Sequence, residues 1–299
     1  MDVRRQADEM ERSPRRRTMD QASRLRELVG KKKEIRVVSV ASGKGGVGKS
    51  CIAINLAIAL SRLDVRVLIL DADFGLANID IMLGVTSKYN VSHVLRGEKT
   101  LGEIIQLGHE GVRFISGGSG VSDLLNLEEE KVLQLFDSIV GIEAQADFII
   151  VDIGAGINEN IMQMILASTE TIVVTTPEPT AILDAYALIK AIVKRNIAHP
   201  IHILINKCDS KKEAERVEEG FIEVVGRHLG KNINPLGLIM YDNDVSLSIK
   251  RQTPIIVSSP GNATSREISM IARDIMQLPG IKTTGNLFSR IFSRILGES

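Results

Sequence analysis

A glycine-rich segment, GKGGVGKS at residues 43–50, joins a β-branched run, IRVVSVAS, to the helical pattern SCIAINLAIALSRL. It satisfies GxxxxGK[ST] in the strand–loop–helix setting that this pattern requires. Glycines let backbone N–H groups close around phosphate oxygens, and the N-terminus of the following helix adds partial positive charge. The segment predicts a phosphate-binding loop at the carboxyl end of a strand in an α/β sheet.

Apolar runs continue along the chain, and helical patterns such as AILDAYALIKAIVKRN and EEKVLQLFDSIVGI separate them. The runs are VRVLILDAD, VRFISGG, DFIIVDIG, TIVVTTPE, IHILINKCD, PLGLIMYD and PIIVSS. Near-continuous apolar strands alternating with helices predict the α/β class, with a mostly parallel central sheet and helices on both faces. We expect one such domain at residues 35–280.

Composition argues against several kinds of site and partner. Lys plus Arg and Asp plus Glu both number 37, so net charge gives no evidence for a polyanionic partner. Cys51 and Cys208 belong to no CxxC pair, so we interpret both as reduced thiols and not as metal or iron–sulfur ligands. The 5 histidines lack ligand spacing. We also expect no secretory signal and no membrane-spanning segment.

Three aspartates lie near strand ends close to the predicted loop. Asp71 and Asp73 end the run VLILDAD, and Asp152 lies in FIIVDIGAG, where Gly154 would let the backbone approach the outer phosphate. In phosphoryl transfer one acid holds the metal shell and another orients the attacking water. A single strand-end Asp more often caps a helix or forms a turn, but three beside a phosphate loop favour a catalytic site.

The segment Asn206-Lys207-Cys208-Asp209 has two interpretations. It fits NKxD, the guanine-reading motif of GTPases, in which the Asp accepts two hydrogen bonds from the guanine edge. Alternatively, Asn206 contacts the purine and Asp209 merely starts the helix that begins SKKEAERVEE. Spacing alone leaves both open.

Several segments together carry a family resemblance. KGGVGKS, with its additional Lys44, resembles the deviant Walker A loop of the MinD/ParA class of SIMIBI-type P-loop NTPases. LILDADFGLANIDIMLG is similar to the segment that follows in MinD-like proteins. Within that class, VVTTPEPTAILDAYALIK, ISGGSG and DQASRLR resemble the FlhG family, also called YlxH or FleN. Those MinD-like ATPases control flagellar number and placement.

The resemblance implies roles for individual residues. Lys44 matches a lysine that reaches across a dimer interface to the partner's phosphates, Asp73 matches the acid that positions water, and Asn206 matches an adenine contact. Lys49 would reach the outer phosphates and, with Lys44 and Asp73, complete the expected catalytic set. The expected magnesium site is Ser50, Asp71 and Asp152. The expected nucleotide-binding residues are Gly43, Lys44, Gly45, Gly46, Val47, Gly48, Lys49, Ser50, Cys51, Gly154 and Asn206.

The implied activity is slow, Mg²⁺-dependent ATP hydrolysis, so the expected cofactors are ATP and Mg²⁺. Lys207-Cys208-Asp209 departs from the family pattern and keeps GTP open.

The C-terminal segment, residues 281–299, contains an amphipathic pattern. Its apolar stripe is Leu287, Phe288, Ile291, Phe292, Ile295 and Leu296. Such a helix is too short to span a bilayer, so it lies on anionic lipid or docks in a groove of its own domain or of a partner. One copy would bind lipid weakly and two copies on a dimer more tightly, so we expect a cytoplasmic protein reversibly bound to the inner face of the membrane.

Residues 1–34 form the predicted basic arm, with 11 basic residues against 7 acidic ones. Thr18, Gln21 and Gly30 predict a short helix inside it, which is either a simple cap on the domain or a partner contact. The resemblance implies that this helix binds FlhF, a signal-recognition-type GTPase. The implied contact residues are Asp20, Gln21, Leu25 and Arg26, next to Ala22. A flagellar transcription activator or a motor-switch protein is a further candidate partner.

Three alternative functions remain at this stage. A ParA-like DNA-partitioning ATPase would need a basic surface on its dimer, and the basic arm supports that only weakly, so we expect no specific nucleic acid. A cell-division MinD would share the ATPase and the membrane helix but have no use for DQASRLR. A scaffold that holds nucleotide without turnover would show the same motifs.

Overall fold

A computed structural model describes residues 34–73, 78–118, 146–195, 199–278 and 283–284. Every described residue from Ile35 onward belongs to one compact unit, Ile35–Ser299. The predicted basic arm, the helical pattern at 129–142 and the stripe at 287–296 lie outside the described residues. The domain boundaries at 34 and 280 therefore stay predictions.

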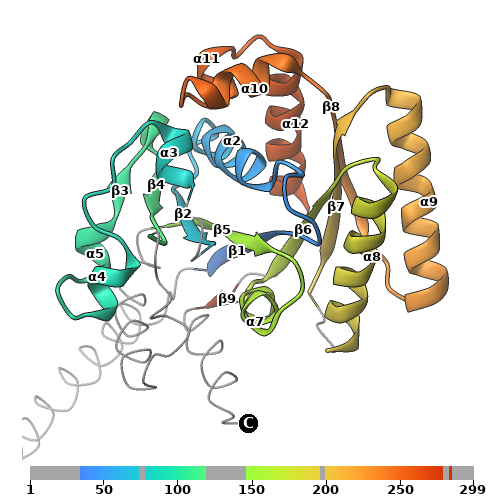
Figure 1. The fold of residues 1–299 in the computed structure, drawn as a ribbon, viewed down its shortest axis with the longest axis horizontal. Coiled ribbons are helices and arrows are strands. Elements are labelled where there is room, and N and C mark those ends of the chain that lie inside the picture. The colour runs from blue at the N-terminus through green and yellow to red at the C-terminus, as the bar shows by residue number, and fades with distance from the viewer. Residues whose placement is uncertain (1–33, 74–77, 119–145, 196–198, 279–282, 285–299) are drawn as a thin grey trace, which may run out of the picture. The chain divides into compact units, whose positions relative to one another are not determined.

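The described elements form one central sheet (Figure 1). Its strand order is β3-β4-β2-β5-β1-β6-β7-β8, and a short β9 pairs with β1. The pairs from β4 through β8 in this order are parallel, and the edge pair β3–β4 is antiparallel. The strands are β1 (Glu34–Ser42), β2 (Val67–Ala72), β3 (Gln106–Leu107), β4 (Arg113–Ile115), β5 (Phe148–Ala155), β6 (Glu170–Thr175), β7 (Ile201–Cys208), β8 (Asn234–Met240) and β9 (Thr283–Thr284).

Helices cover both faces of this sheet, as predicted (Figure 1). Helices α2, α3, α11 and α12 pack on one face, and α4, α5, α7, α8 and α9 pack on the other. The helices are α2 (Lys49–Ser61), α3 (Ile79–Leu83), α4 (Val91–Leu95), α5 (Leu101–Ile104), α7 (Glu159–Ala167), α8 (Pro179–Lys194), α9 (Lys211–Leu229), α10 (Asn243–Lys250), α11 (Ile255–Ser258) and α12 (Ala263–Gln277).

The strand sequences explain the two cores. Successive side chains of a strand point to opposite faces, so a strand covered on both sides must be apolar throughout. In β5, Phe148 and Ile150 join the core beneath α2, whereas Ile149 and Val151 join the core beneath α7 and α8. This is why the strands read as continuous apolar runs.

One predicted strand is wrong. The run PIIVSS forms a turn of helix, α11, in which Ile255 and Ile256 are buried. A run of four apolar residues has no periodicity that separates a strand from a buried helical turn. Pro254 precedes the turn, where its missing N–H costs nothing.

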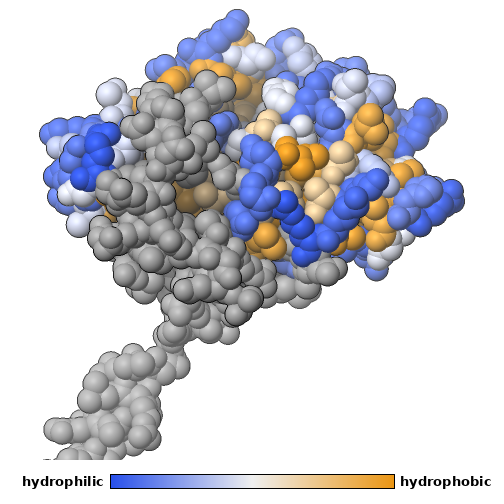
Figure 2. All heavy atoms as spheres, turned by 60° about the horizontal axis from the view of Figure 1, so that its bottom comes forward, coloured by the Kyte–Doolittle hydropathy of each residue, from blue (hydrophilic) through white to orange (hydrophobic). Residues whose placement is uncertain are grey.

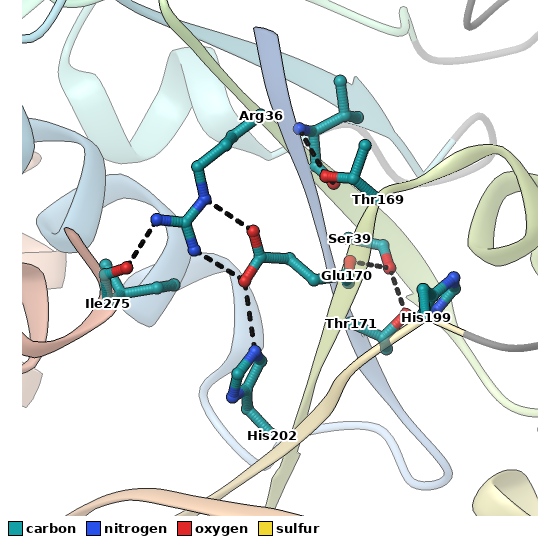
Figure 3. Close-up of polar contacts among 9 residues, drawn as sticks. Arg36, Ser39, Thr169, Glu170, Thr171, His199, His202 and Ile275 are labelled. Carbon is teal, nitrogen blue, oxygen red and sulfur yellow. Dashed lines mark hydrogen bonds and ion pairs between the residues drawn. The ribbon is translucent and has the colours of Figure 1, made fainter. Parts of the chain in front are cut away.

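The amino ends of the strands bury an ionic cluster (Figure 3). The Arg36 guanidinium forms two hydrogen bonds, of 2.7 and 2.8 Å, with the carboxylate of Glu170, and His202 contacts the same carboxylate at 3.1 Å. Burial alone would raise the pKa of Glu170, but the bonds from His202 and Arg36 outweigh it and lower that pKa. Arg36 also donates to the carbonyl of Ile275 and so ties α12 to β1.

None of the described helices is both long and apolar enough to cross a bilayer. On the face that Figure 2 shows, apolar residues are interspersed among polar ones. The prediction of membrane binding concerns residues 287–296, which lie outside the described residues.

Candidate nucleotide-binding site

The glycine-rich loop leaves β1 at Ser42 and enters α2 at Lys49, as predicted. Gly46 and Gly48 have left-handed backbone conformations, with φ of 79° and 94°, which glycine adopts without strain. A Cβ on Gly48 would also clash with the side-chain amide of Asn206, and one on Gly43 would clash with the backbone of Asp184 in α8. The glycines thus let β7 and α8 approach the loop closely.

Lys49 lies at the centre of the site. Its ammonium is 2.7 Å from the carboxylate of Asp152, and the two side chains are only 8% and 2% exposed. Asp152 stands beside Asp71 in the register of β5 with β2, so the loop lysine faces two neighbouring acids. An ammonium group that neighbouring acids hold in place can form charge-assisted hydrogen bonds with a phosphate.

Asp71 is the most perturbed acid of the site. It is fully buried, and burial together with repulsion from Asp152 raises its pKa to about 7, although the backbone N–H groups of Ile79, Asp73 and Asn78 oppose the rise. A carboxyl group whose pKa lies near neutral pH, beside a second carboxylate, is typical of a functional site.

The donor set fits magnesium. Asp71, Asp152 and the Ser50 hydroxyl are oxygen donors, the ligand class that Mg²⁺ prefers. Across the described ranges there is no cluster of three or more His, Cys, Asp or Glu that could hold a metal. Mg²⁺ does not need one, because it usually takes one or two carboxylates and completes its shell with waters and substrate phosphates.

Asp73 follows β2 directly and lies over Gly154 of β5. A Cβ placed on Gly154 would be 3.3 Å from the Asp73 carboxylate. The bare backbone of Gly154 therefore leaves room beside Asp73 for a small reacting group.

Lys44 contacts its own subunit. Its ammonium is 2.6 Å from Glu178, the residue before α8, and 2.9 Å from the hydroxyl of Thr180. The hydrogen bond from Lys44 lowers the pKa of Glu178. Both side chains are partly exposed, 37% for Lys44 and 65% for Glu178, so the lysine lies at the surface of the loop.

The end of β7 is fastened to the loop by two side chains. The Asn206 amide donates to the carbonyl of Val47 at 2.8 Å, and the Lys207 ammonium donates to the carbonyl of Gly46 at 2.7 Å. The contact of Lys207 with the loop was not predicted. The only sequence signal for it is the position of Lys207 in NKCD.

The interpretation of Asp209 as the start of α9 is wrong. The N-cap of α9 is Ser210, whose hydroxyl accepts the backbone N–H of Glu213.

Both cysteines are free thiols, as predicted. Cys51 follows the loop in the first turn of α2, and burial raises its pKa to about 11. Burial likewise raises the pKa of Cys208 to about 12. Such pKa values keep both side chains protonated near neutral pH.

Comparison with known proteins agrees with this geometry. Residues 33–276 match the family model described as ParA, NUBPL iron-transfer P-loop NTPase. The chain belongs to the ParA/MinD family of P-loop NTPases. ATP and Mg²⁺ are the cofactors of this family.

Two curated relatives are flagellar proteins. The antiactivator FleN of Pseudomonas aeruginosa is 32% identical over 251 residues, which is 84% of this chain and 90% of FleN. The flagellum site-determining protein YlxH of Helicobacter pylori is 33% identical over 263 residues, which is 85% of this chain and 89% of YlxH.

A solved structure shares the fold. Septum site-determining protein MinD of Pyrococcus horikoshii, complexed with Mg-ADP, superposes with a TM-score of 0.68. It is 23% identical, and the match covers 81% of this chain and 96% of that one.

Proposed function

We propose that this chain is a MinD-like ATPase that dimerises with ATP, binds the inner membrane surface reversibly and regulates flagellar number and placement. The observation that carries the nucleotide part is the buried pair of Lys49 and Asp152 beside Asp71. The names of the relatives FleN and YlxH support the flagellar part.

In the proposed reaction the loop holds the phosphates and Lys49 neutralises charge on the outer ones. Asp73, above the bare backbone of Gly154, orients the water that attacks the terminal phosphorus. The bond from that phosphorus to the bridging oxygen of ADP breaks, ADP leaves with that oxygen, and a proton of the water passes to the inorganic phosphate that forms. Mg²⁺ held near Ser50, Asp71 and Asp152 would supply charge neutralisation.

Lys44 couples this site to dimerisation in the proposal. Its contact with Glu178 is an exposed ion pair, a class that stabilises proteins weakly. The ammonium can therefore leave Glu178 for the more strongly charged phosphates of a partner subunit. A dimer then carries two copies of residues 287–296, which bind lipid more tightly than one copy.

Size-exclusion chromatography with ATP and Mg²⁺ tests the coupling. We expect the unaltered chain to shift toward dimers, Asp73→Ala to accumulate dimers because hydrolysis stops, and Lys44→Ala to stay monomeric. Dimers of Lys44→Ala would refute the proposed role of that lysine.

Sedimentation with liposomes tests the membrane step. Full-length protein and a chain ending at residue 285 are compared with ATP, with ADP and without nucleotide. We expect ATP-dependent sedimentation of the full-length protein only; equal sedimentation of both chains would refute a role for residues 287–296. Flagellar counts in cells lacking the protein test the biological role.

We also propose that Asp20, Gln21, Leu25 and Arg26 contact a signal-recognition-type GTPase. The measurement is the GTPase rate of that partner with the full chain and with a chain lacking residues 1–30. Equal stimulation by both chains would refute this contact.

A further inference from the structure

The end of β7 departs from regular strand geometry where it meets the loop. Its pairing with β8 shifts register between Ile205 and Cys208, and Lys207 adopts a left-handed conformation with φ of 57°. A left-handed conformation costs free energy in a residue other than glycine, so the conformation persists only where other contacts hold it. Here those contacts are the hydrogen bonds from Asn206 and Lys207 to the carbonyls of Val47 and Gly46.

This arrangement places Asp209 directly after β7 and close along the chain to the contacts that this strand makes with the phosphate loop. Asp209 is two residues beyond Lys207, at the carboxyl end of a parallel strand, where ligands of open α/β sheets bind. Because Asn206 and Lys207 bind the carbonyls of the adjacent loop residues Val47 and Gly46, the backbone of only a few residues sets how far residue 209 lies from the loop.

Asp209 has no structural task that the described part of the chain reveals. Ser210 caps α9 in its place. The Asp209 side chain is exposed, and within the described ranges no hydrogen bond or ion pair involves its carboxylate. A carboxylate that neither caps nor pairs, close along the chain to a nucleotide site, is available to a ligand.

The base that matches such a carboxylate is guanine. Its Watson–Crick edge presents two adjacent donors, N1–H and the N2 amino group, and the two oxygens of a carboxylate accept both. Adenine presents the N6 amino group beside the lone pair of N1, and that lone pair is repelled by the second carboxylate oxygen. We propose that Asp209 is a base-reading residue through which this site binds a guanine nucleotide in addition to ATP.

This inference rests on the proposed nucleotide site and adds a second substrate class to it. Selection between the bases is moderate, because Asp209 is exposed and water can still hydrate N1 of a bound adenine. Strong rejection requires that the unmatched polar group be buried without a partner. Both nucleotides therefore bind, and Asp209 sets their ratio.

The test is displacement of a fluorescent ATP analogue from the full-length chain, with Mg²⁺, by ATP, GTP and XTP. We expect the GTP concentration that displaces half of the analogue to lie within about tenfold of the corresponding ATP concentration. Asp209→Asn should weaken the binding of GTP at least about tenfold, because it replaces one charged acceptor by a donor. The affinity for ATP should stay within about threefold of its original value. The same variant should bind XTP more tightly, since an amide N–H donates to the 2-oxo group of xanthine.

The matched control is Asp274→Asn, the same change at an exposed position of α12, which should alter no displacement curve. The readout is the ratio of GTP to ATP affinity within one preparation, so a partly unfolded variant does not distort it. If Asp209→Asn does not fold at all, Asp209→Ala is measured by the same ratio.

Three results would overturn the inference. GTP that fails to displace the analogue when ATP does would leave the nucleotide site in place but remove guanine binding. A GTP to ATP ratio unchanged by the variant at residue 209 would remove Asp209 as the base reader. Failure of ATP as well as GTP to bind would overturn the proposed function and this inference with it.

Discussion

The two ends of the central sheet both bury carboxylates, but the pKa of the buried acid is shifted in opposite directions at the two ends. At the amino ends, Glu170 accepts hydrogen bonds from Arg36 and His202, and its pKa is lowered. At the carboxyl ends, burial and the nearby Asp152 raise the pKa of Asp71 to about 7. The amino end satisfies its charge within the protein. At the carboxyl end Lys49 pairs with Asp152, but Asp71 accepts only backbone N–H groups among the described residues, so a metal and a nucleotide can compensate its charge.

The largest expected effect comes from breaking the amino-end cluster. Arg36→Met leaves the carboxylate of Glu170 buried without its bidentate partner and should lower the free energy of unfolding by about 3–5 kcal/mol in urea titrations. The double change Arg36→Met with Glu170→Leu removes both charges and should recover most of this loss.

The matched control for Arg36 is Arg66→Met. Arg66 pairs with Asp147 at 2.9 Å, but its side chain is 51% exposed. That change should cost less than about 1 kcal/mol. Equal losses for the two arginine variants would contradict the contrast between a buried structural pair and a surface pair.

The carboxyl end should behave in the opposite direction. Asp71→Asn removes a buried charge whose pKa is raised to about 7, so it should increase the unfolding free energy by up to about 3 kcal/mol near pH 8.5 without Mg²⁺. The same variant should lose ATP hydrolysis, because the metal site loses a carboxylate. A variant that is both less stable and fully active would refute this assignment.

The pH dependence of stability separates the two ends. Burial and the charge of Lys231 lower the pKa of His199 to about 4, so its contribution to stability is complete above about pH 6.5 and is lost as the pH falls toward 4. The raised pKa of Asp71 has the opposite sign, and its contribution grows as the pH falls below 7.

The two effects partly cancel in the unaltered protein. Asp71→Asn removes the gain from Asp71 and keeps the loss from His199, so stability should fall by about 1.5 kcal/mol more than in the unaltered chain between about pH 6.5 and 5. Urea titrations at several pH values measure this difference. Identical pH profiles for the two proteins would contradict the cancellation.

The smallest effect concerns the surface of the loop. Glu178→Gln removes the charge that holds Lys44 in its own subunit and should strengthen ATP-dependent dimerisation about two- to threefold in sedimentation measurements. Glu159→Gln, which removes another exposed ion pair, with Arg195, is the control and should change nothing. Weaker dimerisation of Glu178→Gln would show that Glu178 supports the dimer.

The sequence alone determined the class of this fold and the position of its loop. Both are local properties. Continuous apolar runs specify strands covered on both faces, and GKGGVGKS between a strand and a helix specifies a phosphate cradle. The same locality explains the wrong prediction at residues 254–259, where four apolar residues carry no usable period.

Only the tertiary structure decided which side chains meet. The pair of Lys49 with Asp152, the contact of Lys44 with Glu178 and the fastening of Lys207 to Gly46 each join residues more than a hundred positions apart. Such contacts follow from the strand order, which places β5 and β6 beside β1 and β7 beside β6, and no local pattern encodes that order. The raised pKa of Asp71 has the same origin, because burial and a neighbouring carboxylate exist only after the sheet has assembled.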